Sequence, residues 1–527
     1  MHLRRSIRTG RPRNAALLLA TAALLVSACS TSGPARSAGG AAEAALAALP
    51  RSTPSVLAPY YGQKLNWRGC GVPGFQCATM KAPLDYAHPD GKDVKLAVAR
   101  KRATGKGKPL GSLLVNPGGP GGSAIGYLQQ YAGIGYPAEV RARYDMVAVD
   151  PRGVARSEPV ECLDGRQMDA FTQTDTTPDD QRETGQLVDA YKKFAEGCGA
   201  HSAGLLRHVS TVEAARDMDI LRAALGDRKL TYVGASYGTF LGATYAGLFP
   251  ERVGRLVLDG AMDPRLPARR LNLDQTAGFE TAFQSFAKDC VRQPDCPLGR
   301  KGTTPAQVGH NLSAFFKKLD AHPLATGDAD GRKLGEALGT TGVIAAMYDE
   351  ASWAQLREAL TSAMKEGDGA GLLVLSDSYY ERDGQGRYSN LMFANAAVNC
   401  LDLPAAFSSP EQVEKALPSF EKASPVFGEG LAWASLNCAY WPVKARGEPH
   451  RIEAKGAAPI VVVGTTRDPA TPYRWARSLA AQLTSGRLLT YEGDGHTAYG
   501  RGSACIDSAI NAYLLHGTPP TRGKRCS

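Results

Sequence analysis

Short apolar runs rich in β-branched residues recur along the chain, and each is followed within two residues by glycine, aspartate or proline. The runs cover residues 111–115, 146–149, 230–233, 256–258, 459–463 and 487–491. Helical patterns lie between several of them, as in residues 211–225, which carry apolar side chains at helical spacing and stop at Gly226. Strands that alternate with helices predict a largely parallel, buried sheet, with functional residues just after the strands.

The strand pattern stops between about residues 263 and 455 and resumes at residue 459. The intervening segment is predicted to be mostly helical, as an inserted cap over the strand ends would be. A length of 527 residues leaves room for such a second domain. We therefore expect an α/β core in two parts, residues 57–262 and 456–527, with a helical cap at residues 263–455.

The first 29 residues are predicted to be an export signal of the lipoprotein type rather than part of the fold. Five arginines without an acid precede an apolar run at residues 15–26, which is too short to span a bilayer comfortably. The following Val-Ser-Ala-Cys resembles a bacterial lipobox, so Cys29 is expected to be lipidated and to anchor the protein to the outer face of the cell membrane. Ordinary cleavage with release is the alternative, and Arg4-Arg5 leaves the export route open between the general and twin-arginine pathways. Residues 30–56, rich in Ala, Gly, Ser and Pro, are predicted to be a flexible tether.

The cysteine count agrees with export to an oxidising compartment. Eleven cysteines less Cys29 leave ten, an even number that disulfides can pair. Connectivity does not follow from sequence, but sequential pairing closes the shortest loops and is favoured: Cys70–Cys77, Cys162–Cys198, Cys290–Cys296, Cys400–Cys438 and Cys505–Cys526. The alternative, a metal site, has no Cys-x-x-Cys or clustered Cys/His spacing to support it. No metal or other cofactor is expected.

The segment Gly234-Ala-Ser236-Tyr-Gly238 lies between a predicted strand, residues 230–233, and a predicted helix, residues 240–249. A sharp turn from strand to helix exposes the serine oxygen, and small residues two positions before and after the serine avoid clashes there. The helix N-terminus favours the negative charge that develops during attack. Ser236 is therefore predicted to be a nucleophile.

A nucleophilic serine needs a base and a group that orients the base. In proteins with this kind of turn the chain order is serine, acid, histidine. Asp468 and His496 each follow a predicted strand in that order, so His496 is the expected base and Asp468 the expected orienting acid. Asp259 is the rival acid, although a turn aspartate is the better interpretation, and Thr471 either orients Asp468 or belongs to the turn.

A glycine-rich loop, residues 116–123, follows the first predicted strand of the core. Glycines let backbone N–H groups approach a substrate, so Gly118 or Gly119, together with the N–H of Tyr237, is expected to bind an oxyanion. A phosphate loop is the alternative, but the Gly-Lys-Ser/Thr ending is missing. Asp150-Pro-Arg152-Gly is expected to hold a loop beside the site.

Several of these segments occur together in one known family. They are Met80-Lys-Ala-Pro-Leu-Asp-Tyr, Asn116-Pro-Gly-Gly-Pro-Gly-Gly, Asp150-Pro-Arg-Gly, Gly234-Ala-Ser-Tyr-Gly, Gly464-Thr-Thr-Arg-Asp-Pro-Ala-Thr-Pro and Gly495-His496. From about Trp67 to the C-terminus the chain resembles the exported actinobacterial tripeptidyl aminopeptidases, α/β-hydrolase serine peptidases related to prolyl aminopeptidase. The resemblance implies an α/β-hydrolase fold, a mostly parallel sheet flanked by helices with an inserted helical cap. It also implies release of short peptides, tripeptides above all, through an acyl-enzyme without a metal. Pro117 and Tyr237 depart from the His and Trp usual in prolyl aminopeptidases.

An aminopeptidase must also recognise a free ammonium, and a buried carboxylate would do this. Asp349, Glu350 and Asp402 in the predicted cap are the candidates, and the sequence does not choose among them. An ester hydrolase or lipase with the same triad, and more remotely a solute-binding lipoprotein, are the other classes.

The formal net charge is +10, of which the first 28 residues carry +5, so nucleic-acid binding is not expected. The expected partners are peptide or protein N-termini and, through Cys29, the membrane. Oligomeric state, preferred residues and physiological substrate stay open.

Overall fold

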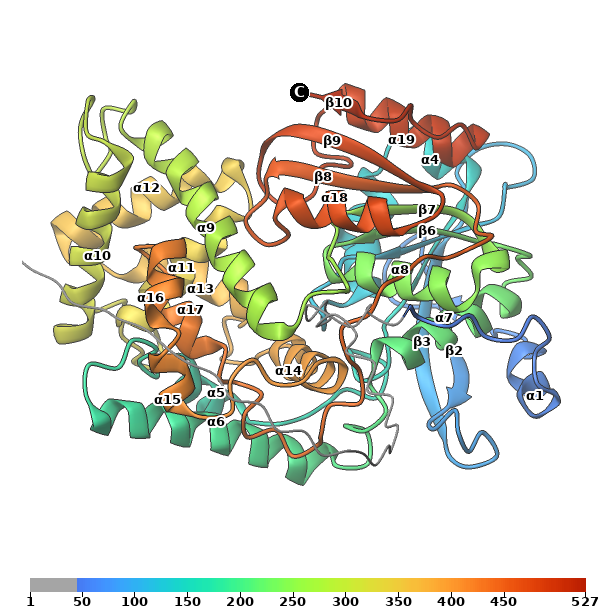
Figure 1. Ribbon diagram of the computed structural model, residues 1–527, viewed down its shortest axis with the longest axis horizontal. Coiled ribbons are helices and arrows are strands. Elements are labelled where there is room, and N and C mark those ends of the chain that lie inside the picture. The colour runs from blue at the N-terminus through green and yellow to red at the C-terminus, as the bar shows by residue number, and fades with distance from the viewer. Residues whose placement is uncertain (1–44) are drawn as a thin grey trace, which may run out of the picture. The chain divides into compact units, whose positions relative to one another are not determined.

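The computed structural model describes residues 45–527, so the predictions for the export signal and Cys29 lie outside the described residues. In the described part, a ten-stranded sheet has the order β1-β2-β3-β5-β4-β6-β7-β8-β9-β10 (Figure 1). The strands are β1 Arg68–Gly69, β2 Gln76–Pro83, β3 Asp93–Lys101, β4 Ser112–Asn116, β5 Asp145–Val149, β6 Leu230–Ala235, β7 Val253–Asp259, β8 Ile460–Arg467, β9 Gly486–Asp494 and β10 Lys524–Cys526. From β5 to β10 neighbouring strands are parallel, whereas β1, β2 and β3 add an antiparallel edge.

The six apolar runs of the sequence correspond to β4 through β9. Their alternating side chains reach opposite faces of the sheet, as the period of two residues requires. On β8, Ile460 and Val462 pack in the cluster of α7 (Thr211–Ala224), α8 (Tyr237–Leu248) and α18 (Tyr473–Gln482). Val461 and Val463 pack on the other face with α4 (Ala138–Arg143) and α19 (Ala504–His516). Helices therefore cover both faces, which is why the central strands are apolar throughout.

The segment between β7 and β8 is helical and builds a second apolar core of its own. Its helices are α9 Ala268–Cys290, α10 Pro305–Ala321, α11 Glu336–Met347, α12 Trp353–Thr361, α13 Ala370–Tyr380, α14 Leu391–Asp402, α15 Pro410–Glu414, α16 Leu417–Ala423 and α17 Gly428–Ala434. Phe283 and Phe286 of α9 lie at the centre of this core and are fully buried. We call the segment, residues 263–455, the cap.

Two helices from the predicted core segment pack both on the main apolar cluster and on the cap. α5 (Gly165–Thr172) and α6 (Gln181–Ser202) lie beside α15, α16 and α17 (Figure 1). Leu187 and Tyr191 of α6 share a buried cluster with Phe407, Phe420 and Trp433 of the cap. The amphipathic pattern of a helix shows that one face is buried but does not identify the surface that covers it.

The last part of the predicted tether, residues 45–56, lies along the core in the structure. The Leu46 N–H donates to the Arg451 carbonyl at 2.8 Å, and the Leu49 N–H donates to the Leu248 carbonyl at 2.9 Å. Both leucines pack against the main apolar cluster. Their side chains gain buried apolar contacts, which a composition rich in small residues does not reveal.

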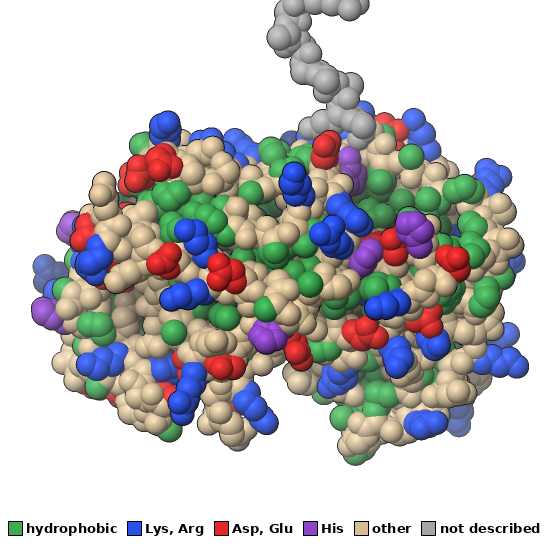
Figure 2. Space-filling model, turned by 90° about the horizontal axis from the view of Figure 1, so that it is seen from below, with side chains coloured by type: hydrophobic (Ala, Val, Ile, Leu, Met, Phe, Trp, Pro, Cys, Tyr) green, Lys and Arg blue, Asp and Glu red, His purple; other side chains and the backbone are tan. Residues whose placement is uncertain are grey.

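The ten described cysteines form five disulfides, and the pairs are those that the sequential order favoured. Cys162–Cys198 joins the loop after β5 to α6, and Cys505–Cys526 joins α19 to β10. Among residues 45–527, none of the helices combines the length and the apolar character that a membrane crossing requires. On the face seen in Figure 2, basic and acidic side chains are interspersed rather than gathered in one patch.

Candidate active site

Ser236 stands on the turn between β6 and α8 with a positive φ of 56° and ψ of −125°. This conformation is costly for a residue with a side chain and is typical of a nucleophile held on a sharp strand-to-helix turn. The Ser236 N–H donates to the Asp259 carbonyl at 2.9 Å, and the Ser236 carbonyl accepts the Thr239 N–H at 2.8 Å. A Cβ atom at Gly234 would lie 2.4 Å from the Gly238 carbonyl oxygen, so the tight turn needs glycine there.

His496, which follows β9, is paired with Asp468, which follows β8. The His496 Nδ1 atom lies 2.9 Å and 3.0 Å from the two Asp468 carboxylate oxygens. The buried carboxylate also accepts the N–H groups of Ala470 (3.0 Å), Thr471 (2.8 Å) and Thr497 (3.3 Å). Because Nδ1 faces the carboxylate oxygens, its hydrogen is placed to donate to Asp468, which leaves Nε2 as the basic atom.

Thr471 links the Asp468–His496 pair to the cavity that Ser236 lines. Ser236 and Thr471 both line it, and the Thr471 hydroxyl donates to Asp468 at 3.0 Å and lies 3.4 Å from His496 Nδ1. A Cβ atom at Gly260 would lie 3.1 Å from His496 Cε1, so the turn after β7 also closes against the imidazole. The structure therefore brings the three residues of the predicted triad to the carboxyl ends of β6, β8 and β9.

Asp259, the rival acid, binds the backbone of the loop that carries His496. Its carboxylate accepts the N–H groups of Ala498, at 3.0 Å and 3.1 Å, and of Tyr499, at 2.8 Å. Burial raises the pKa of the Asp259 carboxyl. Asp259 holds the backbone that follows His496, while Asp468 contacts the imidazole itself.

The glycine-rich loop packs directly on the serine. A Cβ atom at Gly118 would lie 2.8 Å from Ser236 Cβ and 2.9 Å from the Tyr237 nitrogen. The Gly118 N–H, however, donates to the side-chain oxygen of Asn116 at 2.9 Å. This engagement argues against Gly118 as an oxyanion donor and leaves Gly119, which lines the cavity, with Tyr237. The sequence does not show which of two neighbouring glycines has a free N–H group, and only the hydrogen-bond partners in the structure distinguish them.

The Asp150-Pro-Arg152-Gly segment holds the loop beside the site, as expected. Asp150 accepts hydrogen bonds from the Ser123 hydroxyl and the Ile125 N–H, both at 2.9 Å, at the start of the helix that follows the glycine-rich loop. Arg152 is buried and donates two hydrogen bonds to Asp217, both at 2.7 Å. The buried Arg152–Asp217 ion pair therefore anchors the Asp150-Pro-Arg152-Gly segment, and Arg152 does not reach the cavity.

The cap contacts the loop that carries His496, a feature without a signal in the sequence. The His496 N–H donates to the Tyr348 carbonyl at 2.8 Å, and the two rings are edge to face with centroids 5.6 Å apart. Arg501 pairs with Asp349 of the cap at 2.7 Å and donates to the His496 carbonyl. The segment after α11 therefore helps to hold His496, although it lies far from it along the chain.

The three acids proposed for ammonium recognition lie elsewhere. Asp349 is engaged with Arg501, and Glu350 is exposed. Asp402 accepts the N–H of Thr211 at 2.9 Å and also its hydroxyl, and burial raises the pKa of Asp402 to about 7. The part of the chain that the structure describes places none of the three on the wall of the Ser236 cavity. Position in the cap does not determine which acids face the serine, so the sequence could not select among them.

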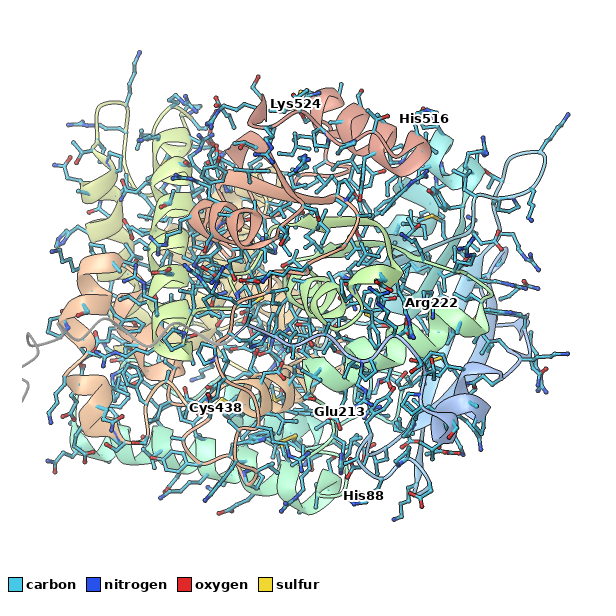
Figure 3. All side chains as sticks on the ribbon, turned by 45° about the vertical axis from the view of Figure 1, so that its right-hand side comes forward. His88, Glu213, Arg222, Cys438, His516 and Lys524 are labelled. Atoms are coloured by element: carbon cyan, nitrogen blue, oxygen red, sulfur yellow. A yellow bond between two sulfur atoms is a disulfide. The ribbon has the colours of Figure 1, made fainter. Side chains whose placement is uncertain are left out.

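The cavity beside Ser236 has a volume of about 300 Å³ and lies between the glycine-rich loop and the cap. Its cap wall comes from α9, α13, α14, α17 and the segments that follow α11 and α17. Cys438, labelled in Figure 3, belongs to this wall, and its disulfide with Cys400 ties the segment after α17 to α14. The nucleophile therefore faces a chamber built largely by the cap.

Two groups of side chains in the described part have atoms close enough to hold a metal ion. They are Asp85, His208 and Glu213, and Asp175, Asp320 and Glu336. Glu213 lies 3.8 Å from the Arg152 guanidinium, whose charge opposes a cation there. Burial and the neighbouring acids raise the pKa of Glu336 to about 7. Neither group includes a residue of the Ser236 cavity.

Comparison with known proteins gives consistent matches. The family model described as "alpha/beta hydrolase fold" matches residues 111–358, and the model "TAP-like protein" matches residues 424–526. The "Serine protease Hip1" of Mycobacterium tuberculosis is 38% identical over 488 residues, covering 89% of this chain and 92% of that protein. The "Carboxylesterase B" of the same organism is 37% identical, with 89% and 91% covered. The "Tripeptidyl aminopeptidase" of Streptomyces coelicolor is 32% identical, with 88% and 86% covered.

Proposed function

The chain belongs to the TAP-like α/β-hydrolases and is a serine hydrolase of the peptidase kind, and we propose that it is an exported aminopeptidase that releases tripeptides from free N-termini. The observation that supports the catalytic part is the strained Ser236 at a cavity that Thr471 also lines, since the Thr471 hydroxyl contacts both members of the Asp468–His496 pair. The relative named tripeptidyl aminopeptidase supports the choice of reaction.

In the proposed mechanism the Ser236 hydroxyl attacks the scissile carbonyl while His496 Nε2 takes its proton. Asp468 keeps the imidazole in the required tautomer and stabilises the imidazolium. The N–H groups of Gly119 and Tyr237 bind the oxyanion. His496 then protonates the leaving amine, and water, activated by the same imidazole, releases the tripeptide from the serine.

The proposed location is the outer face of the cell membrane, with the lipid on Cys29. The lipobox-like Val-Ser-Ala-Cys supports the anchor, and five disulfides among the described cysteines suit an oxidising compartment. Metabolic labelling with a radioactive fatty acid tests the anchor, because Cys29→Ala should abolish the label and release the protein into the medium.

Ester hydrolysis by the same triad is the second candidate. A relative named carboxylesterase B and the lack of a carboxylate on the described wall of the cavity favour it. Prolyl aminopeptidase activity has less support, because Pro117 and Tyr237 replace the His and Trp usual in that family.

A paired assay on the purified protein separates these reactions. A tripeptidyl chromogenic amide, its N-acetylated twin and a short acyl ester are compared, with Ser236→Ala as the control. Cleavage of the free-amine peptide alone, lost in the variant, is the expected result. Cleavage of the ester instead of the free-amine peptide, or equal cleavage of the acetylated peptide, would replace the aminopeptidase assignment by that of an esterase or an endopeptidase.

A further inference from the structure

We propose that the cavity beside Ser236 binds the acyl part of the substrate as an uncharged peptide chain, through side-chain amides, and rejects charged side chains at the two positions before the scissile bond. The inference rests on the proposed function, since it names the substrate class of that same site. The described residues on the cavity wall include neither an acid nor a lysine or arginine.

Five primary amides take the place of charged groups on this wall. They are Asn272 and Gln275 of α9, Asn395 and Asn399 of α14, and Asn437 after α17. Five hydroxyl side chains, Ser236 among them, and otherwise apolar or aromatic residues and Gly119 complete the wall. A primary amide both donates and accepts hydrogen bonds, as a peptide group does. A wall of this kind matches the main chain of a peptide and offers no counter-charge.

Three of these amides are held in place by the protein itself. Asn399 donates to the side-chain oxygen of Asn395 at 3.0 Å, and Asn395 donates to the Pro120 carbonyl at 3.1 Å. Gln275 donates to the Ala470 carbonyl, beside the Asp468 turn, at 2.8 Å. Each of the three amides keeps hydrogen-bonding capacity beyond these contacts. They are therefore pre-oriented, which lowers the entropic cost of binding a chain between Ser236 and the cap.

A charged side chain meets no opposite charge on the described wall of this cavity. Moving an ionised side chain from water into a small cavity without a counter-charge is costly, and neutral amides replace its hydration only in part. Two of the acids proposed for ammonium recognition are already engaged, Asp402 with Thr211 and Asp349 with Arg501, and neither lines the cavity. A volume of about 300 Å³ is at the lower end for ligand sites, so the N-terminal residue of a tripeptide and its ammonium extend to the opening.

The first test measures kcat/KM for tripeptidyl amides on the unmodified protein. The residue before the scissile bond, and separately the middle residue, is varied between Asp and its neutral isostere Asn, and between Lys and the similarly long Met. We expect at least a tenfold lower kcat/KM for both charged residues at each position. A smaller effect, or rejection of only one sign of charge, would overturn the inference. If no neutral tripeptide is cleaved in a Ser236-dependent way, the proposed function fails instead.

A charge introduced into the cavity provides the second test. Asn272→Asp and Asn437→Asp replace an amide by a carboxylate of the same shape, and both residues are partly buried on the cavity wall. At pH 8 we expect the Lys-to-Met ratio of kcat/KM to rise at least tenfold and the Asp-to-Asn ratio to fall. Asn66→Asp adds the same charge at an exposed position and should leave both ratios unchanged. Ratios that stay at their original values in both cavity variants would contradict the proposal.

Discussion

Replacing Arg152 by methionine is expected to lower the free energy of unfolding by about 3–5 kcal/mol, the usual cost of breaking a buried ion pair from one side. The guanidinium is fully enclosed and donates twice to Asp217, at 2.7 Å each. It also donates to the carbonyls of Pro83, Leu84 and His208, at 2.9 Å each. Methionine fills much of the volume but leaves these acceptors without that donor.

Most of the cost comes from Asp217, whose carboxylate would stay buried. It would still accept a hydrogen bond from the Tyr86 hydroxyl at 2.7 Å. Neutralising the acid should therefore recover part of the loss, so Arg152→Met combined with Asp217→Asn should be more stable than the sum of the two single changes predicts.

Urea denaturation followed by tryptophan fluorescence measures the effect, with the midpoint and the slope fitted separately. Arg166→Met, at an exposed arginine, is the matched control and should change the free energy of unfolding by less than about 0.5 kcal/mol. A loss below about 1 kcal/mol for Arg152→Met at unchanged slope would refute the argument that this buried pair anchors the loop.

Three further perturbations follow from the site. Thr471→Val removes a donor to the Asp468 carboxylate and should lower kcat about tenfold with little change in KM; an unaltered kcat would show that the remaining donors suffice. Arg501→Gln removes one of the ties between the cap and the loop of His496 and should lower kcat several-fold, and a second substitution, Asp349→Asn, should add little if the two act as a pair. In the folded protein the pKa of Asp402 is raised to about 7. Between about pH 4 and 7 the folded protein therefore binds more protons than the unfolded chain, so the contribution of Asp402 to the free energy of unfolding falls as pH rises. Asp402→Asn should flatten that fall in a series of melting curves, and an identical pH profile would contradict the assignment.

Much of the core and the candidate triad could be predicted because their signals are local. Each strand from β4 to β9 is a short apolar run, and the turn around Ser236 needs glycines at fixed spacing whatever surrounds it. Asp468 and His496 were found because residues that follow parallel strands meet at one edge of the sheet. The antiparallel strands β1 to β3 were missed, because β2 and β3 alternate buried and exposed side chains and so lack the continuous apolar runs of β4 to β9.

The sequence by itself determined the six strands β4 to β9 along the chain, the interruption by a helical segment and the residue types at the strand ends, because backbone geometry and side-chain periodicity are properties of neighbouring residues. Only the tertiary structure decided that α6 covers the cap, that Asn116 engages the Gly118 N–H and that no acid on the described wall of the cavity faces Ser236. These outcomes depend on which surfaces of distant segments meet. Burial, hydrogen-bond partners and local charge arise from such contacts, and the spacing of residues along the chain does not contain them.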